Sequence, residues 1–223
     1  MSDNPAWPHP GSSERLAIEG PAGALELLVS APAHAVEPQG VGIVCHPHPM
    51  HGGTLDNKVA YMLARSCNEA GLTAVRFNFR GVGASAGAFD EGRGESEDLL
   101  AVVQWCREQW PDARLVLLGF SFGAYIALHN TARVKPVRLV TVAPPLRYFA
   151  EGEVPVPPCP WLVIQGDADD VVDSREVRER LQGLDPAPQV RVLAGVGHFF
   201  HGHLTDLREI VVSTLHSAWQ TLQ

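Results

Sequence analysis

The pentapeptide at residues 119–123, Gly-Phe-Ser-Phe-Gly, is the feature that most constrains the fold of this chain. Four apolar residues, 115–118, precede it and predict a buried strand, whereas residues 124–128 follow it with helical propensity. A Gly-x-Ser-x-Gly turn between a strand and a helix lifts its serine hydroxyl above the edge of a sheet. Glycine is needed on both sides because side chains would clash where strand and helix pack closely. We therefore predict Ser121 as a nucleophile.

The same pattern recurs as Gly-Ala-Ser-Ala-Gly at residues 83–87, so the motif alone does not identify the nucleophilic serine. Residues 80–87 have the composition of a loop, with no helical segment behind them. We expect Ser85 to be a flexible loop residue without a chemical role.

Around these motifs, short apolar segments alternate with helical ones, and a hairpin precedes the alternation. Predicted strands cover residues 15–19, 24–30, 41–45, 72–77, 115–118, 137–143, 161–165 and 190–193. Predicted helices cover residues 56–70, about 97–109, 122–132, 174–182 and 204–219. This order predicts an α/β fold with a mostly parallel central sheet of about eight strands, flanked by helices on both faces. We expect a flexible N-terminal tail over residues 1–13 and a single domain over residues 14–223.

Composition excludes several classes of partner. The net charge of −8 disfavours nucleic acids and anionic membranes, which attract basic surfaces. The N-terminal residues lack the basic and apolar regions of a signal peptide, and no apolar run is long enough to span a bilayer. The four cysteines form no C-x-x-C pair and predict neither a disulfide framework nor a zinc ribbon. We expect a cytoplasmic protein that needs no cofactor and acts on a small-molecule acyl substrate.

A nucleophilic serine needs a base to take its proton and a carboxylate to orient that base, in the chain order serine, acid, histidine. Four aspartates follow the predicted strand 161–165 and compete for the acid position. Asp173 directly precedes a predicted helix and is better interpreted as its N-cap. Asp167 is interpreted as a residue that tightens the turn. We choose Asp169, with Asp170 as the alternative.

The histidine expected to act as the base is His198, in the glycine-rich loop directly after the predicted strand 190–193. His201 and His203 lead into the last helix, where a solvated or capping role is expected. Only His198 lies where the chain order requires a base.

An oxyanion hole needs two backbone N–H donors, one from the residue after the nucleophile and one from the loop after the third strand. The first is Phe122. In the second loop, Pro47 and Pro49 have no N–H, which leaves His48 and Met50 as early donors. We choose His48, whose side chain is a candidate for the pocket wall or for a purely structural role.

Three segments of the sequence resemble the α/β-hydrolase superfamily, and more narrowly its small bacterial serine hydrolases, sometimes grouped with dienelactone hydrolase-like proteins. They read Cys-His-Pro-His-Pro (45–49) with Gly-Gly-Thr (52–54) and Asn-Lys (57–58), Arg-Phe-Asn-Phe-Arg-Gly-Val-Gly (76–83) and the pentapeptide at 119–123. The resemblance implies a triad of Ser121, Asp169 and His198. Dienelactone hydrolases proper carry a cysteine nucleophile, whereas this chain has a serine.

Larger members of the superfamily insert a helical lid after the sixth strand. Here residues 144–160 are few and proline-rich, which favours a stiff, extended connector and a lidless, open site. Such a site suits a small or partly exposed acyl group.

The function predicted from the sequence is hydrolysis of a small ester or thioester, as by a carboxylesterase or thioesterase, through an acyl-enzyme intermediate. Cleavage of an amide or N-terminal peptide bond is the alternative within hydrolases. A second alternative is a metal site formed by His46, His48 and His51 with His198, His201 and His203. A third is a hydrolase fold that has lost catalysis and serves only for binding.

Overall fold

A computed structural model describes residues 8–34, 40–150 and 152–220, with side chains placed as far as residue 216. The strands are β1 Ser13–Gly20, β2 Gly23–Ser30, β3 Gly40–Cys45, β4 Thr73–Phe77, β5 Arg114–Phe120, β6 Arg138–Val142, β7 Trp161–Gly166 and β8 Gln189–Leu193. The helices are α1 Lys58–Glu69, α2 Arg93–Gln109, α3 Phe122–His129, α4 Thr131–Val134, α5 Ser174–Leu181 and α6 Leu204–Gln220, with 3-10 turns η1 Pro49–His51 and η2 Leu146–Tyr148.

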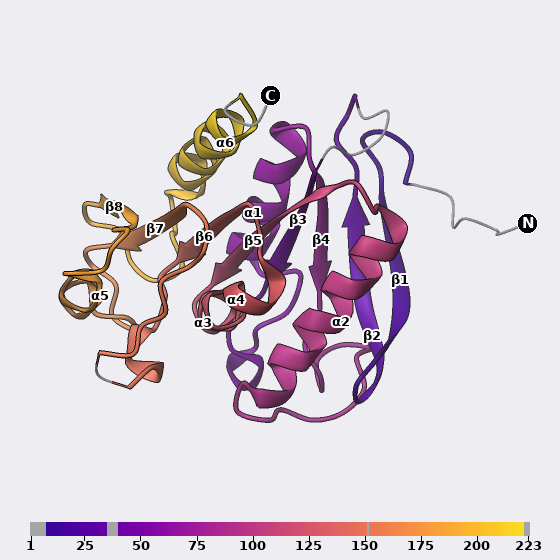
Figure 1. Ribbon diagram of the computed structural model, residues 1–223, viewed down its shortest axis with the longest axis horizontal. Coiled ribbons are helices and arrows are strands. Elements are labelled where there is room, and N and C mark those ends of the chain that lie inside the picture. Colours follow the sequence, from indigo (N-terminus) through magenta and orange to yellow (C-terminus); the bar gives the residue numbers. More distant parts are fainter. Residues whose placement is uncertain (1–7, 35–39, 151, 221–223) are drawn as a thin grey trace, which may run out of the picture.

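The strands form one eight-stranded sheet in the order β1-β2-β4-β3-β5-β6-β7-β8, which confirms the predicted α/β class (Figure 1). The β1–β2 hairpin pairs Gly20 with Gly23, as the turn residues predict, and β2 also lies antiparallel to β4. From β4 to β8 all neighbouring strands are parallel.

Helices cover both faces of the sheet, because the inner strands are apolar on both sides (Figure 1). On one face α2, α3 and α5 bury residues such as Leu99, Ile126 and Val177 against the sheet. On the other face α1 and α6 bury residues such as Leu63 and Leu207. Each fully buried large apolar side chain contributes about 1.5–3 kcal/mol, so these two layers hold the sheet between them.

Two helices differ from their predicted extents by more than two residues. The helix expected from about Glu97 begins at Arg93, because the buried Glu95 carboxylate accepts the backbone N–H groups of Asp90 and Gly92 and caps the first turn. The helix expected over residues 122–132 is divided at Asn130, whose side-chain amide donates to the Ile126 carbonyl at 2.9 Å.

The predicted tail falls only partly within the described residues, since residues 1–7 lie outside them. Within the part described, Ser12 N–H donates to His9 O at 2.8 Å and Gly11 N–H donates to Pro32 O at 3.1 Å. Residues 9–12 therefore form a turn fixed to the segment after β2.

The parallel strands end at one edge of the sheet, where ligand sites of open α/β sheets form. The loops after β3, β5, β7 and β8 all open there. In the described residues between β6 and β7, the 3-10 turn η2 is the one helical element, so the fold has no lid.

Candidate active site

Ser121 lies in the turn between β5 and α3, and its backbone has φ +54° and ψ −121°, a conformation that strongly favours glycine. Its N–H donates to the Val142 carbonyl at 2.9 Å, which fixes the turn to β6. A β carbon on Gly119 would collide with the Gly123 carbonyl, and one on Gly123 would collide with the Cys45 carbonyl. Both flanking glycines are therefore required by close backbone approach.

His198 stands between Ser121 and Asp169. Its Nε2 lies 3.2 Å from Ser121 Oγ, and its Nδ1 lies 2.8 Å from Asp169 Oδ2. Because a carboxylate only accepts, Nδ1–H donates to Asp169 and leaves Nε2 free to accept the serine proton. The structure thus brings together the three side chains predicted from the chain order.

The Asp169 carboxylate is held in place by the loop after β7. Its Oδ1 accepts the backbone N–H groups of Val171 at 2.9 Å and Val172 at 2.8 Å. Burial acts to raise the pKa of Asp169, but the hydrogen bonds from His198, Val172 and Val171 outweigh it and hold the pKa below its usual range. The group facing His198 is therefore a carboxylate anion.

The neighbouring aspartates have other partners. Asp173 caps α5 by accepting Arg175 N–H at 2.7 Å, as predicted. Asp167 accepts Gly195 N–H at 2.6 Å and so ties its own loop to the loop that carries His198. It is Asp169, not Asp170, that meets the histidine.

The N–H groups of Phe122 and His48 donate to no other residue in the described part of the chain. Met50 N–H, the other early donor of its loop, is bonded to His48 Nδ1 at 3.2 Å. The pKa of His48 is lowered by burial and by the neighbouring His51, so the imidazole is neutral at neutral pH. The two N–H groups expected to form an oxyanion hole are thus available.

His46 has a structural role. Its Nδ1 donates to the Pro47 carbonyl at 2.6 Å and its Nε2 accepts the Phe79 N–H at 3.0 Å. Burial lowers its pKa to about 4, partly opposed by the hydrogen bond to Pro47. Both ring nitrogens are therefore occupied in the neutral tautomer.

The two histidine clusters do not form a metal site. Among the described residues no group of three or more His, Cys, Asp or Glu side chains could hold a metal ion. His203 Nδ1 lies 2.8 Å from Asp206 in the first turn of α6, in the capping region expected for it.

Ser85 lies in a loop, as predicted, but the expectation that it is flexible there is wrong. Its side chain is buried, and its hydroxyl donates to Asn78 O at 2.7 Å and accepts Glu26 N–H at 2.9 Å. It fixes the glycine-rich loop to β2 and lies outside the triad. The burial of Ser85 could not be predicted from the loop composition, because its hydrogen bonds join segments that are distant in the sequence.

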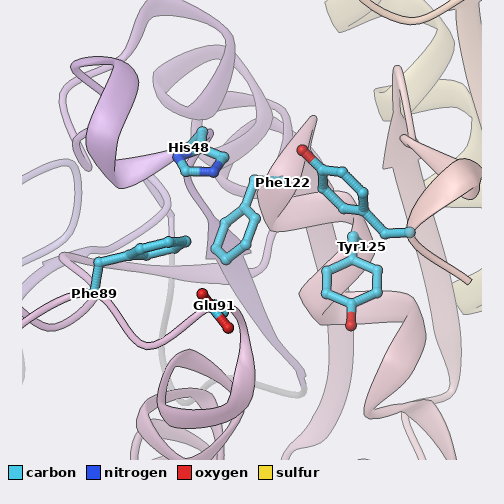
Figure 2. A pocket seen from close by; sticks show the side chains of 6 residues that line it. His48, Phe89, Glu91, Phe122 and Tyr125 are labelled. Carbon is cyan, nitrogen blue, oxygen red and sulfur yellow. The ribbon is translucent and has the colours of Figure 1, made fainter.

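A pocket of about 330 Å³ is lined in part by Phe122, the residue that follows Ser121 in the nucleophile turn (Figure 2). Its walls come from four segments of the chain and comprise His48, Phe89, Glu91, Phe122, Tyr125 and Tyr148. Of these side chains, only that of His48 was predicted from the sequence to line a pocket, because the others carry no motif and meet only in the folded chain.

The fold and the serine, histidine and aspartate side chains at the sheet edge define a class, the lidless α/β serine hydrolases. The chain is 44% identical to an α/β serine hydrolase homologue from Coxiella burnetii, with a TM-score of 0.87 over 91% of this chain and 97% of that one. It is 43% identical to XC6422 from Xanthomonas campestris, described as an α/β serine hydrolase without a lid, with a TM-score of 0.88 over 95% and 97%.

Residues 24–152 match the family described as X-Pro dipeptidyl-peptidase (S15 family), and the chain belongs to this family of α/β hydrolases. It is also 33% identical to the uncharacterized protein RP471 of Rickettsia prowazekii, over 82% of this chain and 80% of that protein. The chain is therefore a hydrolase. Within the described ranges, no helix combines the length and apolar character needed to cross a bilayer.

Proposed function

We propose that the chain hydrolyses a small ester or thioester through an acyl-enzyme intermediate on Ser121. The observation that carries this proposal is the continuous hydrogen-bonded chain from Asp169 through His198 to Ser121. The pocket lined by Phe122 and His48, the two expected oxyanion donors, has a volume suited to a small substrate group. All four cysteines are free, in keeping with a cytoplasmic enzyme.

In the first half of the reaction, Ser121 Oγ attacks the substrate carbonyl carbon while His198 Nε2 takes the hydroxyl proton. The carbonyl electron pair moves onto its oxygen, which accepts the N–H groups of Phe122 and His48. When the carbonyl reforms, the bond to the alcohol or thiol breaks, and the leaving group takes the proton from His198. Asp169 holds the imidazole and stabilises its cationic form.

In the second half, water replaces the leaving group. His198 takes a proton from the water as its oxygen attacks the acyl carbon of the Ser121 ester. The second tetrahedral intermediate collapses, Ser121 Oγ recovers the proton from His198, and the carboxylic acid leaves. No group outside this chain and water is required.

A second candidate substrate is an amide, specifically a peptide with proline in its second position. Membership of the X-Pro dipeptidyl-peptidase (S15) family favours it. The same residues would perform the same steps, with an amine in place of the alcohol or thiol.

A substrate panel of p-nitrophenyl esters, acyl thioesters and X-Pro p-nitroanilides decides between these candidates. We expect the highest kcat/KM on an ester or thioester, and a loss of about a thousandfold or more in Ser121→Ala. We also expect a fluorophosphonate to label the wild type and not the variant. Equal hydrolysis by Ser121→Ala and wild type would remove the basis of the proposal.

A further inference from the structure

The pocket that Phe122, the residue after Ser121, helps to form is lined mainly by aromatic rings. The His48 ring centroid lies 4.9 Å from those of both Phe89 and Phe122, and the Phe89 and Phe122 centroids lie 5.8 Å apart. Tyr125 continues the series at 6.2 Å from Phe122, and Tyr148 packs edge-on against Tyr125 at 5.3 Å. The faces of such rings carry negative partial charge and attract organic cations.

One charged side chain lies on this aromatic wall. Figure 2 shows the Glu91 carboxylate below the His48, Phe89 and Phe122 rings, and Glu91 is the one carboxylic acid among the described residues that line the pocket. Its backbone has φ +53°, which is unfavourable for a residue with a β carbon. The buried Glu95 holds this conformation by accepting the N–H groups on either side, those of Asp90 and Gly92.

The positive groups near Glu91 leave it available to a ligand. Arg93 Nη1 lies 3.6 Å from its carboxylate, but Arg93 is largely exposed and makes its shorter bond, 3.0 Å, to Asp90. Exposed pairs of this kind contribute little. His48 lines the pocket and can carry a positive charge, but it is neutral at neutral pH because burial and the neighbouring His51 lower its pKa. No described lysine or arginine lines the pocket.

We propose that this pocket binds an alkylated ammonium group of the substrate, so that the enzyme prefers esters or thioesters that carry a cationic group. Aromatic rings line the space that the methyl groups of such a cation would enter, while Glu91 supplies the opposite charge. The proposal rests on the proposed hydrolase function, since Phe122 and His48 supply both the pocket wall and the oxyanion donors. Glu91 acts on specificity and has no part in the chemical steps.

The test uses two pairs of matched substrates that differ only in charge. One pair is butyrylcholine and neohexyl butyrate, in which carbon replaces the ammonium nitrogen of the alcohol. The other pair places a trimethylammonium or tert-butyl group at the end of the acyl chain of a p-nitrophenyl ester. We expect kcat/KM to favour the cationic member of at least one pair by about tenfold.

Glu91→Gln should lower this preference at least about threefold, because kcat/KM should fall further for the cationic ester than for the neutral one. Glu108→Gln is the matched control, because it removes an equal charge at an exposed position on α2, outside the pocket. Equal kcat/KM for the two members of both pairs, with hydrolysis still dependent on Ser121, would overturn the cation site and leave the hydrolase function standing. If Glu91→Gln had the same preference for cationic esters as the wild type, Glu91 would not contribute to cation binding and the proposal would be overturned.

Binding without hydrolysis separates the two proposals. We expect tetramethylammonium to bind wild type and Ser121→Ala saturably in a calorimetric or NMR titration. Binding should weaken at least about threefold in Glu91→Gln and stay unchanged in Glu108→Gln. If Ser121→Ala retained full hydrolysis while this pattern was observed, the proposed mechanism on Ser121 would fail and the cation site would stand. Absence of saturable binding, or equal binding to Glu91→Gln, would overturn the cation site.

Discussion

Gln165 Nε2 lies 3.1 Å from Asp169 Oδ2, the same carboxylate oxygen that lies 2.8 Å from His198 Nδ1. Gln165 is completely buried at the end of β7, and the same amide nitrogen also contacts the carbonyls of Gly166 and Val172. The glutamine therefore fixes the direction in which the carboxylate faces the imidazole. We assign it a positioning role, because it acts through Asp169.

Gln165→Leu is expected to lower kcat about tenfold and leave KM nearly unchanged. A tenfold change in rate corresponds to about 1.4 kcal/mol, which is close to the lower end of the range for one hydrogen bond to a charged group. Gln189→Leu, at an exposed position on the neighbouring β8, is the control. Steady-state kinetics on the preferred ester separate kcat from KM, and a loss confined to KM or to thermal stability would refute the positioning role.

Gly123→Ala is expected to destabilise the protein by about 1–3 kcal/mol and to reduce activity. The added β carbon would meet the carbonyls of Cys45 and His46, at the start of the loop that carries His48. The collision therefore disturbs the nucleophile turn and the expected oxyanion donor together. Denaturant unfolding and ester hydrolysis measure the two effects.

Gly197→Ala is the matched comparison, since its β carbon would meet only Ala168 O, at 3.7 Å. We expect a change in the free energy of unfolding within about 0.5 kcal/mol for this variant. Equal destabilisation by both substitutions would show that close approach at Gly123 is not the cause.

The sequence predicted most of the fold because its strands and helices are marked locally. Short apolar runs such as Gly40–Cys45 bury both faces, and Gly71 follows α1 with φ +83° as a helix-ending glycine does. The start of α2 was missed because it depends on Glu95 accepting N–H groups within a glycine-rich segment, which gives no periodic signal.

The candidate site was predictable only where chain order limits the choices. Ser121 and His198 each follow a strand in the required order, and the structure brings them together with Asp169. Glu91 and Gln165 were not predicted, because their proximity to the site depends on packing between segments remote in sequence.

The buried imidazole of His46 should make folding stability depend on pH. Its pKa is about 4 in the folded protein against 6.5 for an unperturbed histidine. Between these values the unfolded state binds more protons, so stability falls as pH decreases from about 6.5 to about 4 and then levels off. At 1.36 kcal/mol per pKa unit, we expect a loss of about 2 kcal/mol from this group between about pH 7 and pH 5.

Urea unfolding at each pH measures this loss. His46→Gln should be less stable at neutral pH and should show a shallower decrease toward pH 5, whereas replacing the exposed His201 should not change the slope. An NMR titration of the wild type gives an independent reading. A His46 imidazole that became protonated near pH 6.5 in the folded protein would contradict the prediction.

Arg180, on α5, is expected to fix the pocket wall that carries Tyr148. Its Nη2 atom donates to the carbonyls of Leu146, Phe149 and Ala150 at 2.9, 2.6 and 3.0 Å. Arg180→Met retains much of the aliphatic side chain but removes these bonds, so the turn η2 should loosen at a cost of about 1–2 kcal/mol in stability.

KM should then rise about threefold to tenfold for substrates that contact Tyr148, because part of the binding free energy is needed to order the wall. Acetyl esters, which are too short to contact it, should show unchanged kinetics. Arg178→Met is the control, since Arg178 Nε donates to Ser174 O in its own helix, at 3.2 Å. If KM rose equally for both variants, or equally for short and long substrates, the change could not be assigned to the wall, because Arg180 donates to carbonyls at η2 whereas the bond of Arg178 lies within its own helix.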